Sequence, residues 1–256
     1  MLAIDWSGRV ASERRHLWLA EAAEGRLLRL ECGRSRSEVA DHLIERSGHD
    51  RELVVGFDFS FSLPEWFLDE RGYDTAVELW EAAARDGEQW LRECRPPFWG
   101  RQGKPRPVLP EHLRRTEATL DAVGGIRPKS TFQIGGAGSV GTGSIRGFPV
   151  LARLRKAGFA VWPFDAPAVA PVVVEIYPRA LTGVVVKSSA AARHEYLARL
   201  RPGLPRSLHD LAVDSEDAFD AAVSAIVMSH HADELLALPP VTDPVLLREG
   251  QVWTPG

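Results

Sequence analysis

Cysteine is scarce in this chain, which has only Cys32 and Cys94 in 256 residues. Two cysteines so far apart do not have the spacing of a zinc or iron–sulfur site. They also provide no disulfide framework of the kind that holds small secreted domains together. The sequence therefore predicts free thiols in a reduced, cytoplasmic protein.

Long apolar runs are lacking as well. The longest, such as APAVAPVVV, are too short and too rich in proline to cross a bilayer. Near Met1, the charged residues Asp5 and Arg9 interrupt any apolar segment of the signal-peptide type. We expect neither a membrane span nor a secretion signal.

A basic surplus is missing too, because the formal net charge is −4. Nucleic-acid-binding proteins usually have an excess of lysine and arginine. The charge is nevertheless uneven, since residues 92–156 carry thirteen basic residues against four acidic ones. Such a stretch either follows a phosphate backbone or forms a solvated surface, and composition alone favours the surface.

Apolar runs and turn residues predict alternating strands and helices. Strands are expected within 2–8, in a hairpin over 16–33, and within 52–64, 159–165 and 171–181. Helices are expected at 35–48, 73–93, 110–125, 148–158 and 215–238. This order predicts a single α/β domain over 1–256. We expect a mixed sheet flanked by helices, with a helical and loop insertion at roughly 70–150.

Carboxylates follow the predicted core strands. Asp5 ends the first strand, Asp58 ends the strand ELVVGF, and Glu175 ends PVVVEI. A right-handed crossover would place the first two strands side by side, where two bare carboxylates repel unless a proton or cation lies between them. Asp217 and Asp220, three residues apart, lie on one face of the alanine-rich last helix.

Each acid also has a purely structural interpretation. Asp217 follows Ser215, a residue type that caps helices, and acids are favoured in a first helical turn. Asp5 and Asp58 are able to accept hydrogen bonds within the turns that follow their strands. Three strand-end acids together with an acidic pair on a small-residue helix favour a site for Mg²⁺ or Mn²⁺.

Five segments carry a family resemblance: AIDWSG, VVGFDFSFSLP, KSTFQIGGAGSVGTGS, VEIYPRAL and SEDAFDAAVSA. In order and content they resemble the DUF429 family of predicted nucleases, and the resemblance implies a ribonuclease H-like fold with a mixed five-stranded sheet. The resemblance extends from the first strand to the last helix. It implies metal-dependent phosphodiester hydrolysis of nucleic acid, with metal ligands at Asp5, Asp58, Asp217 and Asp220. Glu175 matches the family pattern of an acid before Tyr-Pro and joins these four as a catalytic candidate.

The same resemblance implies two ions that share Asp5. Substrate-binding candidates lie beside the acids and in the glycine-rich stretch 134–144, whose amides are suited to an anion. They are Trp6, Ser7, Lys129, Gly135, Gly136, Arg146 and Arg179.

Two other functions use the same fold or the same acids. One is a nucleotide-binding enzyme like actin or the sugar kinases, although these need two such domains around a cleft. The other is a non-catalytic module that binds nucleic acid or protein, with structural carboxylates. Metal-dependent stabilisation would favour an enzyme, and ATP binding without nucleic-acid binding would favour the kinase-like protein.

Overall fold

The computed structural model describes residues 1–50, 52–167, 171–201 and 203–256. Within this part of the chain, seven strands form one mixed sheet in the order β3-β2-β1-β4-β6-β5, and β7 also pairs with β6. The strands are β1 (Leu2–Asp5), β2 (Trp18–Ala23), β3 (Arg26–Glu31), β4 (Val54–Phe57), β5 (Ala160–Val161), β6 (Val172–Ile176) and β7 (Val252–Trp253). The α/β prediction is confirmed, but a count of five strands is wrong.

Strand β7 lies in the C-terminal segment, which is punctuated by proline and gives no strand signal. It is two residues long and runs parallel to β6, pairing Glu175 with Val252 and Ile176 with Trp253. Two residues are too few to produce the alternation by which strands are recognised in a sequence.

The centre of the sheet combines an antiparallel hairpin with parallel neighbours. Strand β1 is antiparallel to β2 and parallel to β4, and β4 is parallel to β6. The β1–β4 register pairs Ile4 with Phe57. Because corresponding ends of parallel strands lie at the same edge of a sheet, Asp5 and Asp58 are brought to one edge.

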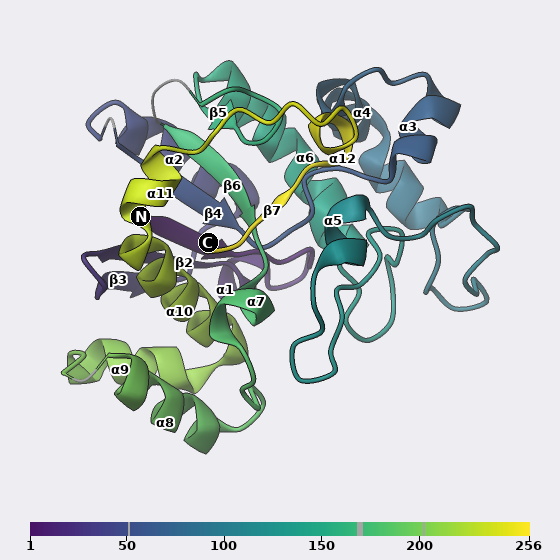
Figure 1. The fold of residues 1–256 in the computed structure, drawn as a ribbon. Coiled ribbons are helices and arrows are strands. Elements are labelled where there is room, and N and C mark those ends of the chain that lie inside the picture. The colour runs from purple at the N-terminus through teal and green to yellow at the C-terminus, as the bar shows by residue number, and fades with distance from the viewer. Residues whose placement is uncertain (51, 168–170, 202) are drawn as a thin grey trace.

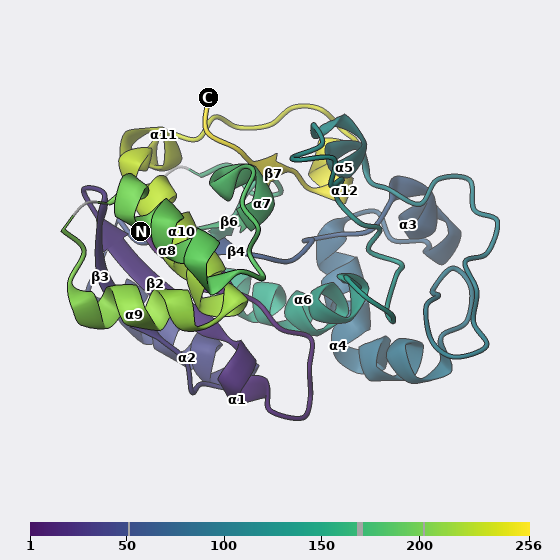
Figure 2. The same cartoon turned by 90° about the horizontal axis from the view of Figure 1, so that it is seen from below.

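Helices cover both faces of the sheet (Figures 1 and 2). One face packs against α2 (Arg36–Ser47), α4 (Ala76–Glu93) and α6 (Gly141–Lys156). The other face packs mainly against α10 (Glu216–His230), with α7 (Pro178–Thr182), α8 (Ala190–Leu200), α9 (Arg206–Asp214) and α11 (Ala232–Leu236) completing the layer. The short helices are α1 (Glu13–His16), α3 (Glu65–Arg71), α5 (Arg115–Thr119) and α12 (Leu246–Glu249).

Small residues let α10 approach the sheet closely. Ala218, Ala221, Ala222 and Ala225 are buried on this helix. Opposite them, a Cβ added to Gly56 of β4 would lie 2.7 Å from the sulfur of Met228 on α10. The close approach lets α10 lie against the face of the sheet that carries Ala3 and Gly56.

No helix in the described residues is long and apolar enough to cross a bilayer.

Candidate functional site

Two strand-end carboxylates form the centre of the candidate site. Asp5 is the last residue of β1, and Asp58 follows β4 with its backbone amide donating to the Ile4 carbonyl at 3.1 Å. Side chains alternate between the faces of a sheet, so Asp5 lies on the same face as Ala3, and Asp58 on the same face as Gly56. This is the face covered by α10. Asp5 is only 9% exposed.

Helix α10 supplies the other two predicted acids. Ser215 caps the helix by accepting from the Ala218 amide at 3.0 Å, and Asp217 and Asp220 follow in the first two turns. The structure thus brings Asp217 and Asp220 together with Asp5 and Asp58, although they are more than 150 residues away in the sequence. The cap and the acidic cluster occur together, so the structural interpretation of Ser215 does not exclude a functional Asp217.

Burial, together with the proximity of the carboxylates, raises the pKa values of three of these acids. Burial, and then the charges of Asp58, Asp220 and Asp217, raise the pKa of Asp5 well above its usual value. Burial and the charge of Asp220 raise the pKa of Asp58 to about 7. Burial also raises the pKa of Asp220, against the opposing effect of the Lys187 ammonium. A cation placed here would relieve the repulsion between these groups.

Two basic side chains that the sequence analysis did not identify, Lys187 and His16, contact the α10 acids. Lys187 Nζ lies 2.5 Å from Asp220 Oδ1, and His16 Nδ1 lies 2.9 Å from Asp217 Oδ2. Neither residue belongs to a recognisable motif, and both are far from α10 in the sequence, so no local signal could have found them.

Among the residues that the structure describes, Asp5 and Asp58 have no cationic partner within ion-pair distance. In the same part of the chain, no group of three or more acidic, histidine or cysteine side chains is already arranged as a metal site.

The fifth predicted acid, Glu175, does not share a sheet face with the aspartates. It pairs in register with Phe57, so its side chain lies on the sheet face opposite to that of Asp5 and Asp58. There Arg114 donates to both of its oxygens, at 2.5 and 2.9 Å, and the Phe61 amide donates at 2.8 Å.

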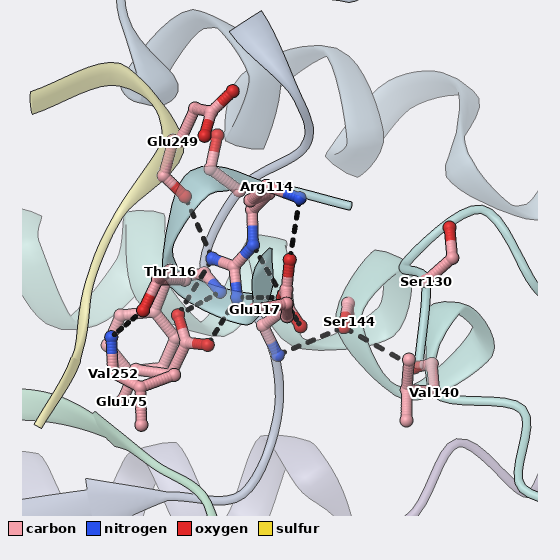
Figure 3. A network of polar contacts seen from close by, with 12 residues as sticks. Arg114, Thr116, Glu117, Ser130, Val140, Ser144, Glu175, Glu249 and Val252 are labelled. Carbon is pink, nitrogen blue, oxygen red and sulfur yellow. Dashed lines mark hydrogen bonds and ion pairs between the residues drawn. The ribbon is translucent and has the colours of Figure 1, made fainter. Parts of the chain in front are cut away.

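Arg114 is the centre of a buried polar network (Figure 3). It is 0% exposed and also donates to Glu117 at 2.8 Å and to the Glu249 carbonyl at 2.8 Å. This network joins the segment before α5 to β6 and to the C-terminal segment. The network provides the Glu175 carboxylate with internal partners, although Glu175 and Asp58 line the same cavity.

A cavity of about 670 Å³ opens beside Asp58. Four of the predicted substrate-binding residues line it, and two further arginines add positive charge. The predicted residues are Trp6, Ser7, Lys129 and Gly136, and the arginines are Arg9 and Arg101. The volume is in the usual range for small-molecule sites. An acidic end next to three basic side chains suits a phosphate group that is accompanied by a divalent cation.

Three other predicted substrate-binding residues make structural contacts. Arg146 forms an ion pair with Glu88 at 2.6 Å and also donates to the Gly8 carbonyl. Arg179 donates to the Val185 carbonyl at 2.9 Å. Gly135 packs against the backbone of Gly100, where an added Cβ would lie 2.5 Å from the Gly100 oxygen.

The glycine-rich stretch is closely packed at its helical end, which makes a stability prediction possible. A Cβ on Gly141 would lie 2.0 Å from the Thr131 carbonyl oxygen, whereas one on Gly143 would lie 3.6 Å from Trp6. We expect Gly141→Ala to lower the free energy of unfolding by about 1–3 kcal/mol. The matched Gly143→Ala should be neutral or stabilising, because alanine favours a helix interior. Urea unfolding measures both, and equal effects would contradict the assigned packing.

Comparison with known proteins gives no relative from which to assign a function. No family model, curated protein or solved structure matches the chain. The functional proposal therefore depends on the geometry of Asp5, Asp58 and the adjoining cavity.

Proposed function

We propose that the protein is a divalent-metal-dependent phosphodiesterase that hydrolyses nucleic acid on a ribonuclease H-like core. The observation that carries the proposal is the side-by-side pair of carboxylates, Asp5 and Asp58, at the ends of two parallel strands, without a cationic partner among the described residues. The resemblance implies an acid on a central strand, one on its neighbour and one on the last long helix. Strands β1 and β4 and helix α10 provide that arrangement.

The donor set fits Mg²⁺ or Mn²⁺. Hard cations of this kind prefer oxygen ligands, and Mg²⁺ commonly uses one or two carboxylates together with water and substrate phosphates. Asp5 and Asp58 would hold the ion, and the raised pKa of each group has burial and unneutralised negative charge as its causes. When bound, the ion would supply charge stabilisation to the phosphoryl oxygens and promote ionisation of the attacking water.

The residues of the cavity would bind and orient the substrate. Lys129, Arg101 and Arg9 would attract and orient the phosphate groups, because fixed positive charges near the reacting phosphorus stabilise its transition state. Trp6 and Tyr177 also line the cavity and offer aromatic surface for a base or sugar. The small volume of the cavity favours a strand end or a single nucleotide unit over an intact duplex.

The cavity volume also supports a second candidate, the nucleotide-binding enzyme. It differs from the first in its ligand, since it would bind ATP in the absence of nucleic acid. Calorimetric titration with ATP and with a short single-stranded oligonucleotide separates the two.

Calorimetry with Mn²⁺ is the direct test of the metal site. We expect the native protein to bind Mn²⁺, and Asp5→Asn to weaken binding by about tenfold or more, which is about 1.4 kcal/mol. The matched control is Asp121→Asn, which changes an exposed aspartate outside the site. Circular dichroism checks that each variant is folded. If the native protein binds no Mn²⁺ at millimolar concentration, the proposal fails and the non-catalytic module becomes the better interpretation.

A further inference from the structure

Lys187 is an unusual residue in the segment between α7 and α8. Its side chain is 7% exposed, whereas the neighbouring Val184 and Val186 are 79% and 64% exposed. Lysine is almost never this buried without a partner, and valine is usually inside. The segment thus places its charge in the interior and two of its three valines outside, which indicates a specific function for the ammonium.

The backbone around Lys187 is fixed by a buried arginine. Arg193 of α8 donates to the Lys187 carbonyl and, through Nε at 3.0 Å, to the carbonyl of Val213 at the end of α9. The Lys187 amide donates to the Val185 carbonyl at 3.1 Å. The ammonium is therefore presented to Asp220 from an anchored loop, and it is not a mobile surface side chain.

The acids around Lys187 carry more negative charge than its single ammonium neutralises. Asp5, Asp58 and Asp220 carry three negative charges when ionised, and Lys187 provides one positive charge. Asp217 is 37% exposed and has His16 as its own partner. The next cation, Arg179, is partly exposed and donates to a backbone carbonyl. A net charge of two minus remains, which a single divalent ion neutralises.

We propose that Lys187 is a built-in second cation, so that the site takes one divalent ion at Asp5 and Asp58 instead of two. The inference rests on the proposed function and differs from the two ions that the resemblance implies. The Lys187 ammonium lies 2.5 Å from Asp220 Oδ1, so it takes the position at that oxygen that a second ion would occupy. The carboxylate of Asp5 is buried and has no hydrogen-bond partner among the described residues, so it is available to bind the divalent ion.

The stoichiometry of Mn²⁺ binding tests the inference. The native protein should bind one ion per chain, and Lys187→Met should bind two, because Asp220 is then free. Lys187→Arg, which keeps the charge, and Lys156→Met, which removes an exposed lysine, should both bind one. Without metal, Lys187→Met should melt at a lower temperature than the native protein and gain more from added Mn²⁺.

Electron paramagnetic resonance of the native protein provides a measurement that does not depend on the variant. One Mn²⁺ per chain gives the hyperfine pattern of an isolated ion at saturation, whereas two ions that share a carboxylate give a spin-coupled spectrum. A coupled spectrum with two ions in the native protein would overturn the inference and leave the proposed function standing. Absence of any ion from the native protein would overturn both. A Lys187→Met variant that folds and still binds a single ion would overturn the inference alone.

Discussion

Replacement of Arg114 with methionine is expected to lower the free energy of unfolding by about 3–5 kcal/mol. Arg114 is fully buried, and its guanidinium is shared by Glu117 and Glu175, which are 4% and 2% exposed. Methionine replaces much of the aliphatic stem, but both carboxylates then lose their cationic partner in the interior. A carboxylate buried without a partner must either remain charged at high cost or take up a proton.

Urea unfolding measures this loss, and the adjacent arginine provides the control. Arg115 forms an ion pair with Asp243 at 2.5 Å but is 44% exposed, so Arg115→Met should cost no more than about 1 kcal/mol. Adding Glu117→Gln and Glu175→Gln to Arg114→Met should recover part of the lost stability, because the uncompensated charges are removed. Equal effects of Arg114→Met and Arg115→Met would show that the buried network contributes little.

The core strands could be predicted because each is a compact apolar run that ends at a turn or an acid. Helix α4 and the hairpin of β2 and β3 have similarly strong patterns, and they lie within the predicted segments. The boundaries of α6 could not be predicted in the same way. The helix begins at Gly141, seven residues before the expected start, and it includes Gly143 and Gly147. Packing of these glycines against Trp6 and Phe59 outweighs their poor helix propensity.

The acids of the candidate site could be located from the sequence, whereas their partners could not. Asp5 and Asp58 are marked by the strands that precede them. Glu175 also follows an apolar strand, but its position in β6 directs its side chain to the opposite face of the sheet. The register between two strands cannot be predicted from the sequence of either strand alone. Lys187 and His16 reach α10 through tertiary packing, with nothing in their surrounding sequence to indicate it.

Replacement of Asp58 with asparagine is expected to stabilise the metal-free protein at alkaline pH. Burial and the nearby Asp220 raise the pKa of Asp58 from its ordinary value of 3.8 to about 7 in the folded protein. Between these two pH values the native state holds a proton that the unfolded state has released. Stability attributable to Asp58 is therefore complete below about pH 4 and is lost as the pH rises through about 7. Asparagine stays neutral and avoids this loss.

The size of the effect follows from the shift in pKa, at about 1.4 kcal/mol per unit. Asp58 also borders the open cavity, where solvent screens part of this effect. We therefore expect the free energy of unfolding to rise by about 2–4 kcal/mol at pH 8, or the melting temperature by roughly 5–15 °C. The gain should nearly vanish at pH 4. Thermal unfolding in a chelator at pH 4, 6 and 8 measures it, with Asp121→Asn as a control whose effect should not vary with pH. A variant less stable than the native protein at pH 8 would contradict the prediction.

Addition of Mn²⁺ should reverse the order of stability, because the ion binds the folded native protein through the carboxylate that the variant lacks. At a concentration one thousand times the dissociation constant, binding stabilises the native state by about 4.1 kcal/mol. At pH 8 this gain exceeds the stability that asparagine confers on the metal-free protein. Asp58 would then destabilise the empty fold and stabilise the metal-bound one, which is the behaviour expected of a ligand and not of a structural acid.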